Sequence, residues 1–232
     1  LKIKGVLAFT MGRVLFHCLP EYSKELFEAL KDFCSHHNVF CITGMKDGTE
    51  FVEQAIYEAT RRYVKEQREY YFMEFTGSSC QEKLSAVPEN NRCQLMKCSS
   101  NDADSLLKLH LEYVRVEVLP AGKTLNADAE KTSLAQILQK QSVYALKHSG
   151  TFVAKAQTNA LAKNYVQIGG VYTLPEYRRK GFASFLVNHI ALNAKAHNKN
   201  AVLFVKVKNI CARHSYEKAG FVKTGDFLIS YY

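Results

Sequence analysis

The sequence predicts an α/β protein built from two units. Strand and helix patterns alternate along the chain, a polar segment at residues 76–92 divides it, and 232 residues suffice for two small cores. Hydrophobic residues make up 47% and charged residues 23%, which is typical of a folded chain. We therefore expect a smaller N-terminal α/β domain at residues 1–75, a linker at 76–92 and a larger domain at 93–232.

The N-terminal part shows two helical patterns between strand patterns. Apolar alternation predicts strands at residues 5–9, 14–18, 39–43 and 69–75, with helices at 21–36 and 49–63. Phe27, Leu30 and Phe33 lie at helical spacing, which favours a core role over a ligand site. The linker is expected because Gly77, Pro88 and two adjacent asparagines fall in one polar stretch.

The C-terminal part continues the alternation with more strands. A strand and a helix are expected first, the helix with Asn101 or Asp102 near its N-cap, and then a loop with a second helix. Three consecutive strands, a helix, a strand and a short helix follow, and a hairpin that turns at Gly225-Asp226 ends the chain. The expected ranges, in order, are 94–97, 101–118, 119–141, 142–147, 151–157, 165–173, 181–197, 201–207, 209–219 and 221–232.

The net charge of +9 narrows the classes of partner. From residue 159 to the end there are eleven Lys or Arg against three Asp or Glu, so the excess lies in the last third. Such a surface attracts nucleic acid, an anionic surface or a polyanionic small molecule. No nucleic-acid reading motif is present, and no apolar run approaches the roughly 20 residues of a membrane span. A phosphate-bearing cofactor accounts for the charge, without nucleic acid or membrane.

The seven cysteines do not suggest a disulfide framework or a metal site. Their number is odd, and none shows a CxxC or Cys/His metal spacing. We therefore expect no metal, reduced thiols and a cytoplasmic protein, and the start of the chain is not typical of a signal peptide.

A basic turn between a strand and a helix is the most informative segment. Residues 171–184 read VYTLPEYRRKGFAS, in which Pro175 ends the strand and Arg178-x-x-Gly181-x-Ala183 opens the helix. Free N–H groups and the dipole at a helix N-terminus favour an anion, and small residues let it approach the backbone. Arg179 and Lys180 add charge. The alternative is an ordinary turn with solvated basic side chains.

A second motif makes this pattern specific. Asn209-x-x-Ala212-x-x-x-Tyr216-x-x-x-Gly220-Phe221 follows the next strand. With both motifs in this order, residues 93–232 resemble the GNAT acetyltransferase superfamily. The resemblance implies a mixed central sheet flanked by helices. It also implies that acetyl-CoA binds the loop and helix start, here Arg178, Arg179, Lys180, Gly181, Phe182, Ala183 and Ser184.

The resemblance also assigns a role to the strand before the turn. Gly169-Gly170 inside a strand indicates a bulge. In the family the pantetheine arm pairs with the exposed backbone beyond such a bulge, which here implies Val171, Tyr172 and Thr173. Asn209 supports either the arm or the start of its own helix as an N-cap.

The chemistry that the resemblance implies is attack by an amine on a thioester. Tyr216 matches the family's general acid for the leaving thiolate, although a packing role is the alternative. The sequence identifies no general base: the bulged strand carries Gln167 and no acid, and His110, His148 and His189 are weak candidates. We expect an N-acetyltransferase for a primary amine of a small acceptor. The alternative is a non-catalytic acyl-CoA-binding sensor or interaction module.

The N-terminal part carries no catalytic motif. Its strand-helix-strand pattern is compatible with a degenerate GNAT-like unit, as in some two-domain acetyltransferases, and with a role in covering an acceptor pocket or in a homodimer contact.

Overall fold

The computed structural model describes residues 5–77, 87–88, 92–119 and 123–232, which form two compact units. The first comprises residues 1–72, 204–208 and 224–232, and the second comprises 73–203 and 209–223. Three strands contribute residues to both units: β4 (Glu66–Phe75), β9 (Asn200–Lys206) and β10 (Phe221–Tyr231). The domain limits expected from the sequence stay a prediction, and most of the expected linker lies outside the described residues.

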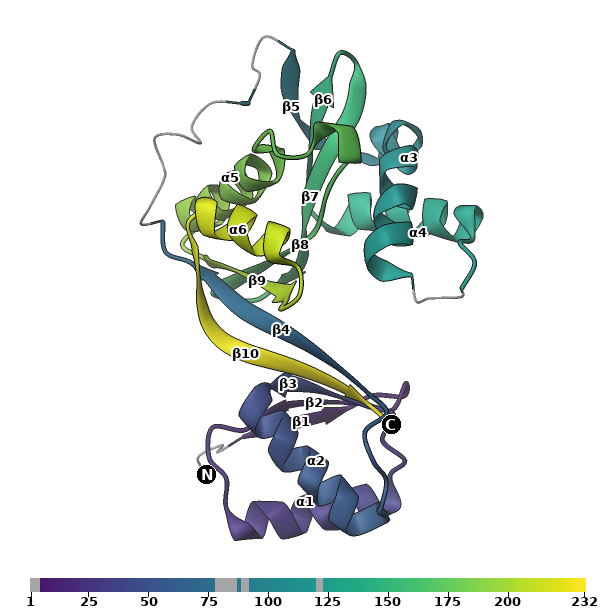
Figure 1. The fold of residues 1–232 in the computed structure, drawn as a ribbon, viewed down its shortest axis with the longest axis vertical. Coiled ribbons are helices and arrows are strands. Elements are labelled where there is room, and N and C mark those ends of the chain that lie inside the picture. Colours follow the sequence, from purple (N-terminus) through teal and green to yellow (C-terminus); the bar gives the residue numbers. More distant parts are fainter. Residues whose placement is uncertain (1–4, 78–86, 89–91, 120–122) are drawn as a thin grey trace. The chain divides into compact units, whose positions relative to one another are not determined.

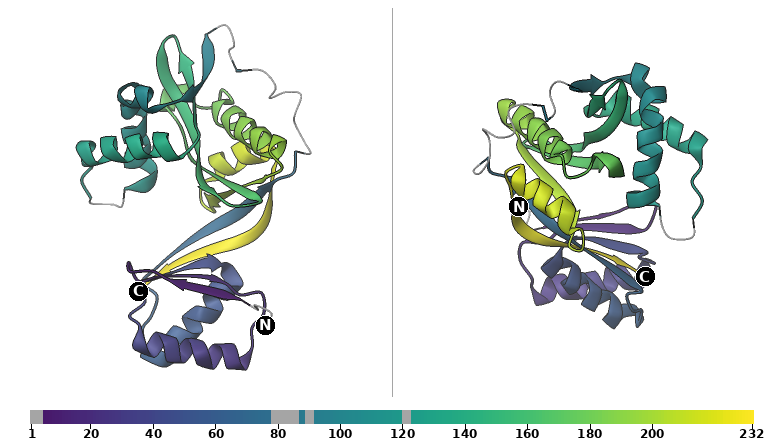
Figure 2. Two further views of the ribbon diagram at one scale, coloured as in Figure 1. Left: turned by 180° about the vertical axis from the view of Figure 1, so that it is seen from behind. Right: turned by 45° about the horizontal axis from the view of Figure 1, so that its top comes forward.

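The first unit is a mixed sheet with two helices on one face (Figures 1 and 2). Its strand order is β1-β2-β3-β10-β4, with β1 antiparallel to β2, β2 parallel to β3, and β3 antiparallel to β10. The elements are β1 (Val6–Phe9), β2 (Val14–Cys18), α1 (Lys24–His36), β3 (Cys41–Met45), α2 (Lys46–Thr60) and β4 (Glu66–Phe75).

Apolar side chains at helical and strand spacing build the core of this unit. Leu30 and Cys34 of α1 meet Val52 and Ile56 of α2 over Ile42 of β3, and all are buried. Phe27 and Phe33, expected in the core, are partly buried against it. These contacts give the unit a core of its own.

The second unit places helices on both faces of an antiparallel sheet with one parallel strand (Figure 1). Its strand order is β9-β8-β7-β6-β5, and only the pairing of β8 with β9 is parallel. The elements are β5 (Cys93–Cys98), α3 (Ala103–Tyr113), α4 (Ala127–Lys140), β6 (Val143–His148), β7 (Thr151–Leu161), β8 (Tyr165–Thr173), α5 (Phe182–Ala196), β9 (Asn200–Lys206), α6 (Ile210–Lys218) and β10 (Phe221–Tyr231).

Strand β7 lies in the middle of this unit. Figure 1 shows α3 and α4 on one side of β7 and β8, and α5 and α6 on the other. Residues 152–158 are consequently buried without interruption, on both faces of the strand. The mixed α/β fold predicted from the sequence is confirmed.

The expected hairpin at the end of the chain is wrong. Residues 221–231 form one continuous strand, β10, and Gly225 is not a turn residue. Beyond Gly225, residues 227–231 pair with β3, from Phe227 against Met45 to Tyr231 against Cys41. The Gly-Asp pair was a turn signal that this strand pairing overrides.

The helix expected at residues 101–118 is also not uniform. A 3₁₀ turn (Ser100–Asp102) precedes α3, and the segment after α3 is a π-helical turn, η3 (Val114–Val118). π-Helical turns are rare in proteins, and those that do occur are often found at functional sites. Within the described ranges, no helix is both long and apolar enough to cross a membrane.

A four-residue sequence occurs at the same place in both units. Leu-Pro-Glu-Tyr stands at residues 19–22, between β2 and α1, and again at 174–177, between β8 and α5. In each case the helix leads to a strand parallel to the first, then to a further helix and a long strand. The units therefore share a β-α-β-α-β order with a common turn.

Candidate functional site

The turn from β8 to α5 has the geometry of an anion cradle. Strand β8 ends at Thr173, Pro175–Tyr177 form a 3₁₀ turn, and Arg178 extends toward the helix. Arg179 and Gly181 adopt positive φ values of 64° and 82°, and α5 begins at Phe182. The second of these conformations suits glycine, which explains the residue at this position.

The N-terminus of α5 is open. Gly181 is its N-cap, no side chain caps the first turn, and the first turn holds no acidic residue. A Cβ at Gly181 would meet nothing within 4 Å. The corresponding helix of the first unit is closed: Ser23 Oγ accepts a hydrogen bond from Leu26 N at 3.2 Å, and Glu25 lies in the first turn. Of these two helices, α5 is the one that presents unused N–H donors to an anion.

The three basic side chains of the turn are exposed, and two are oriented by neighbours. Arg178 Nε donates to Thr173 O at 3.1 Å, and its guanidinium lies 5.7 Å from the centre of the Tyr172 ring. Lys180 Nζ lies 5.4 Å from the centre of the Tyr177 ring. Of the helix residues expected to bind the cofactor, Phe182 and Ser184 are buried and Ala183 is half-buried.

The bulge expected at Gly169-Gly170 is present. Lys155 pairs with Tyr172 and Gln157 with Gly169, so Gly170 and Val171 of β8 lie opposite Ala156 alone. Gly170 has a φ of 57°, and a Cβ there would lie 2.6 Å from Gln157 Cδ. The glycine is thus required by its backbone and by its neighbour.

One buried polar atom at this edge fits a bound ligand. Thr173 Oγ1 is buried and, among the described residues, has no hydrogen-bond partner. Buried hydroxyl groups are normally paired, so an unpaired one beside the cradle is compatible with a polar ligand such as the arm of coenzyme A. The unpaired Thr173 hydroxyl and the open N-terminus of α5 are both compatible with the acetyl-CoA site that the sequence suggests.

Tyr216 and Asn209 both lie on or beside α6. Tyr216 is 8% exposed, and burial is the main cause that raises the pKa of its phenol, followed by the Glu117 carboxylate and Tyr113. The phenol therefore keeps its proton at neutral pH. Asn209 is the N-cap of α6, and its Oδ1 accepts from Ala212 N at 3.1 Å.

The structure adds a carboxylate that the sequence did not single out. Burial is the main cause that raises the pKa values of Tyr113, Tyr172 and Tyr216, and the half-buried Glu117 carboxylate on the π-helical turn η3 adds to each of them. The rings of Tyr113 and Tyr172 meet edge to face, 6.2 Å between centroids. Glu117 is thus a carboxylate whose charge is felt by tyrosines of three elements. The residue pattern at 114–118 gave no sign of the π turn.

The three histidines considered as bases are spread over the unit. His110 is buried, its Nε2 lies 3.1 Å from Glu130 Oε2, and burial lowers its pKa. His189 is on α5 against Tyr144, and His148 is at the end of β6 beside Tyr177. A lysine that the sequence analysis did not consider, Lys155, lies fully buried in β7.

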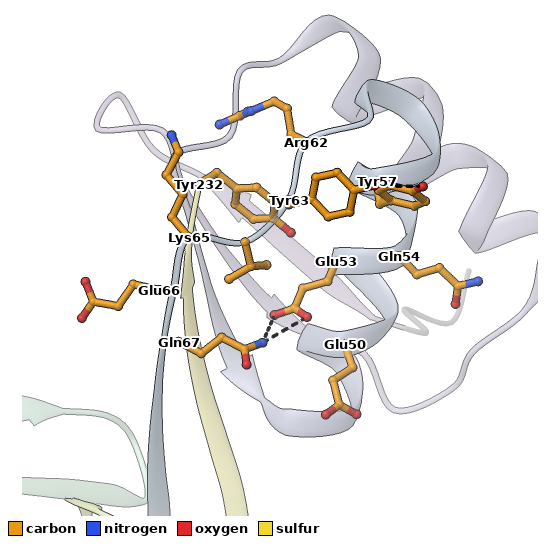
Figure 3. A pocket seen from close by; sticks show the side chains of 11 residues that line it. Glu50, Glu53, Gln54, Tyr57, Arg62, Tyr63, Lys65, Glu66, Gln67 and Tyr232 are labelled. Carbon is orange, nitrogen blue, oxygen red and sulfur yellow. Dashed lines mark hydrogen bonds between the residues drawn. The ribbon is translucent and has the colours of Figure 1, made fainter.

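The first unit holds a hollow of about 610 Å³ between α2 and the segment leading into β4 (Figure 3). Most of its charged groups are already paired. Glu53 accepts from Gln67 Nε2 at 3.0 Å and from Ser230, and Arg62 donates to Asn38 and to Val39 O. Tyr57 and Tyr63 meet through their hydroxyls at 3.3 Å. The hollow therefore offers no evident catalytic group.

Solved structures share the fold across both units. An acetyltransferase from the GNAT family of Colwellia psychrerythraea has a TM-score of 0.68 at 9% identity, covering 100% of this chain and 82% of that one. A structural-genomics protein from Drosophila has 0.64 at 15%, covering 94% and 70%. A GCN5-related N-acetyltransferase-like protein from Streptococcus suis has 0.56 at 14%, covering 99% and 88%.

Comparison of the amino-acid sequence with known families identifies the family more directly than the shared fold does. No curated protein matches the chain. The model of the acetyltransferase (GNAT) family matches residues 105–221, a segment that contains the cradle, the bulge, Glu117 and Tyr216. Because this match spans half of the chain and the fold agrees, the chain belongs to the acetyltransferase (GNAT) family.

Proposed function

We propose that this chain is an N-acetyltransferase that moves an acetyl group from acetyl-CoA to a primary amine of a small acceptor. The observation that carries the proposal is the open N-terminus of α5. It has no capping side chain, no acid in its first turn and a basic turn before it. It belongs to the same unit as the buried phenol of Tyr216.

The residues that hold acetyl-CoA follow from this arrangement. The N–H groups that follow Gly181 donate hydrogen bonds to the pyrophosphate, and Arg178, Arg179 and Lys180 supply positive charge. Val171, Tyr172 and Thr173 offer backbone groups to the pantetheine arm, and the Thr173 hydroxyl gains a partner. When bound, acetyl-CoA supplies an acetyl group activated as a thioester.

Tyr216 supplies the proton that the leaving sulfur needs. Burial raises the pKa of its phenol, so the group is present as the acid over the whole physiological range. Its effect on rate is of the order that general acids provide, roughly 10²- to 10⁴-fold. Asn209 starts the helix that carries Tyr216 and so fixes its position.

Glu117 is the proton acceptor that the sequence did not reveal. Its charge contributes, after burial, to the raised pKa values of Tyr216 and two further tyrosines, which supports this role. It receives the amine's proton directly or through water. A substitution that removes the charge but keeps the shape, Glu117→Gln, tests this role.

A weakly basic amine is the easier acceptor. Deprotonating an amine of pKa about 10.4 at pH 7.4 costs roughly 4 kcal/mol, whereas an α-amine near 7.8 costs well under 1 kcal/mol. Small molecules with an α-amine or another weakly basic primary amine therefore form the preferred class.

Release of the CoA thiol over a panel of primary amines tests the proposal, with binding of acetyl-CoA measured by calorimetry in parallel. Transfer to at least one amine supports the enzyme. Binding without transfer to any amine would instead favour the acyl-CoA sensor. Absence of binding contradicts both.

A further inference from the structure

The most unusual side chain of the second unit is Lys155. It is 0% exposed, at the centre of a strand covered on both faces. Lysine is almost never fully buried unless it is paired. In the described part of the chain no carboxylate forms an ion pair with it, so other contacts hold its ammonium group.

Three groups surround the Lys155 nitrogen. Nζ donates to Gly170 O at 3.1 Å and to Gln157 Oε1 at 3.2 Å, and it lies 4.4 Å from the centre of the Tyr113 ring. An ammonium has three N–H donors, and these two oxygens and one ring face engage all three. Gln157 in turn donates to Asn159 Oδ1 at 3.3 Å. The side chain is thus fixed in one direction, toward the bulge.

The carbonyl that Lys155 contacts belongs to the bulge itself. Gly170 and Val171 are the two residues of β8 that face a single residue of β7. The peptide that joins them has the Gly170 carbonyl at one end and the Val171 N–H at the other. A hydrogen bond from a cation to this carbonyl fixes the peptide plane and polarises its N–H.

We propose that Lys155 is a positioning residue that holds the Gly170–Val171 peptide so that the Val171 N–H faces the acyl donor. The inference rests on the proposed function, because it takes the edge at Val171–Thr173 as the binding edge for acetyl-CoA. Lys155 does not touch the ligand; it acts through the bulge. This role explains why a buried lysine, costly to fold, is placed directly behind two glycines.

Lys155→Met tests the role, since it removes the ammonium and keeps a linear apolar side chain. The affinity for acetyl-CoA in calorimetry is expected to fall about 10-fold, with the fold retained by circular dichroism. Lys147→Met is the matched control: Lys147 of β6 has its Nζ against the ring of Phe152 of β7, and the affinity should not change. Lys155→Gln keeps an N–H donor without charge and should lose only about 3-fold.

The pH dependence separates positioning from a purely structural role. Burial lowers the pKa of Lys155 to about 7, and the titratable groups around it are Cys98, His110 with Glu130, Tyr113 and Tyr172. The wild-type advantage over Lys155→Met in affinity should therefore shrink from pH 6 to pH 8.5.

Each outcome decides the matter. If the wild type binds acetyl-CoA and Lys155→Met binds it equally well at pH 6, this inference fails and the proposed function stands. If the wild type does not bind, the proposed function fails and this inference with it. If neither variant at position 155 folds, the lysine is structural and the positioning role is refuted.

Discussion

The buried charge of Lys155 predicts an unusual dependence of stability on pH. Its pKa falls from an ordinary value of 10.5 to about 7 because the ammonium is removed from water. Between these values the unfolded chain binds the proton and the folded chain does not. Stability must therefore rise with pH in this window, by about 1.4 kcal/mol per pH unit for this one group.

The magnitude follows from the width of the window. From pH 7 to pH 9.5 the contribution amounts to about 3 kcal/mol, a large fraction of the 5–15 kcal/mol typical of a domain. Lys155→Met lacks the titrating group and should lack this rise. Contributions that do not depend on pH, such as the loss of hydrogen bonds to Gly170 and Gln157, cancel when the two pH profiles are compared.

Urea unfolding of the wild type and of Lys155→Met, at half-unit steps from pH 6.5 to 9.5, measures the effect. The free energy of unfolding of the wild type, minus that of the variant, should increase steadily above pH 7. Lys147→Met should follow the wild type. A difference that stays constant with pH would show that Lys155 is protonated throughout and that burial does not act as argued.

Three further predictions concern the site. Gly181→Glu should abolish binding of acetyl-CoA in calorimetry with the fold intact; Gly150→Glu, at a similar φ of 86° and in equally open space, is its control, and unchanged affinity of Gly181→Glu contradicts the cradle. Tyr216→Phe should lower kcat roughly 10- to 1,000-fold with the KM for acetyl-CoA nearly unchanged, while the buried Tyr144→Phe stays active; full activity of Tyr216→Phe removes the acid role. Glu117→Gln should lower kcat roughly 10- to 100-fold, more for amines of high pKa, and equal loss for all amines in steady-state assays speaks against a base.

Local patterns in the sequence predicted most of the helices and strands. The strand at residues 165–173 and the helix after Gly181 were placed closely, because alternation and a glycine before a helical pattern are local signals. Gly225-Asp226 failed as a turn because the strand that pairs with this part of β10, β3, lies far earlier in the sequence. Contacts of this kind are not visible along a sequence.

The sequence indicated only some of the candidate site residues, for a similar reason. The cradle and Tyr216 lie in motifs of fixed spacing, and they stay predictions that the assays above test. Lys155 and Glu117 lie outside any motif. Lys155 alternates with apolar residues, as a surface lysine does in a half-buried strand, and only the helices on both faces of β7 make it internal. Glu117 lies on a π-helical turn that its local sequence does not indicate.

The repeated Leu-Pro-Glu-Tyr turn has a consequence for binding stoichiometry. Two strand-to-helix turns of common layout would offer two places for a polyanion. At α1, however, the first turn already contains a carboxylate, Glu25. Hydrogen bonds from the backbone and from Ser23 lower the pKa of Glu25, so this carboxylate stays ionised beside the start of the helix. A phosphate would have to compete with a tethered carboxylate there and with water alone at α5. One molecule of CoA per chain should therefore saturate the protein.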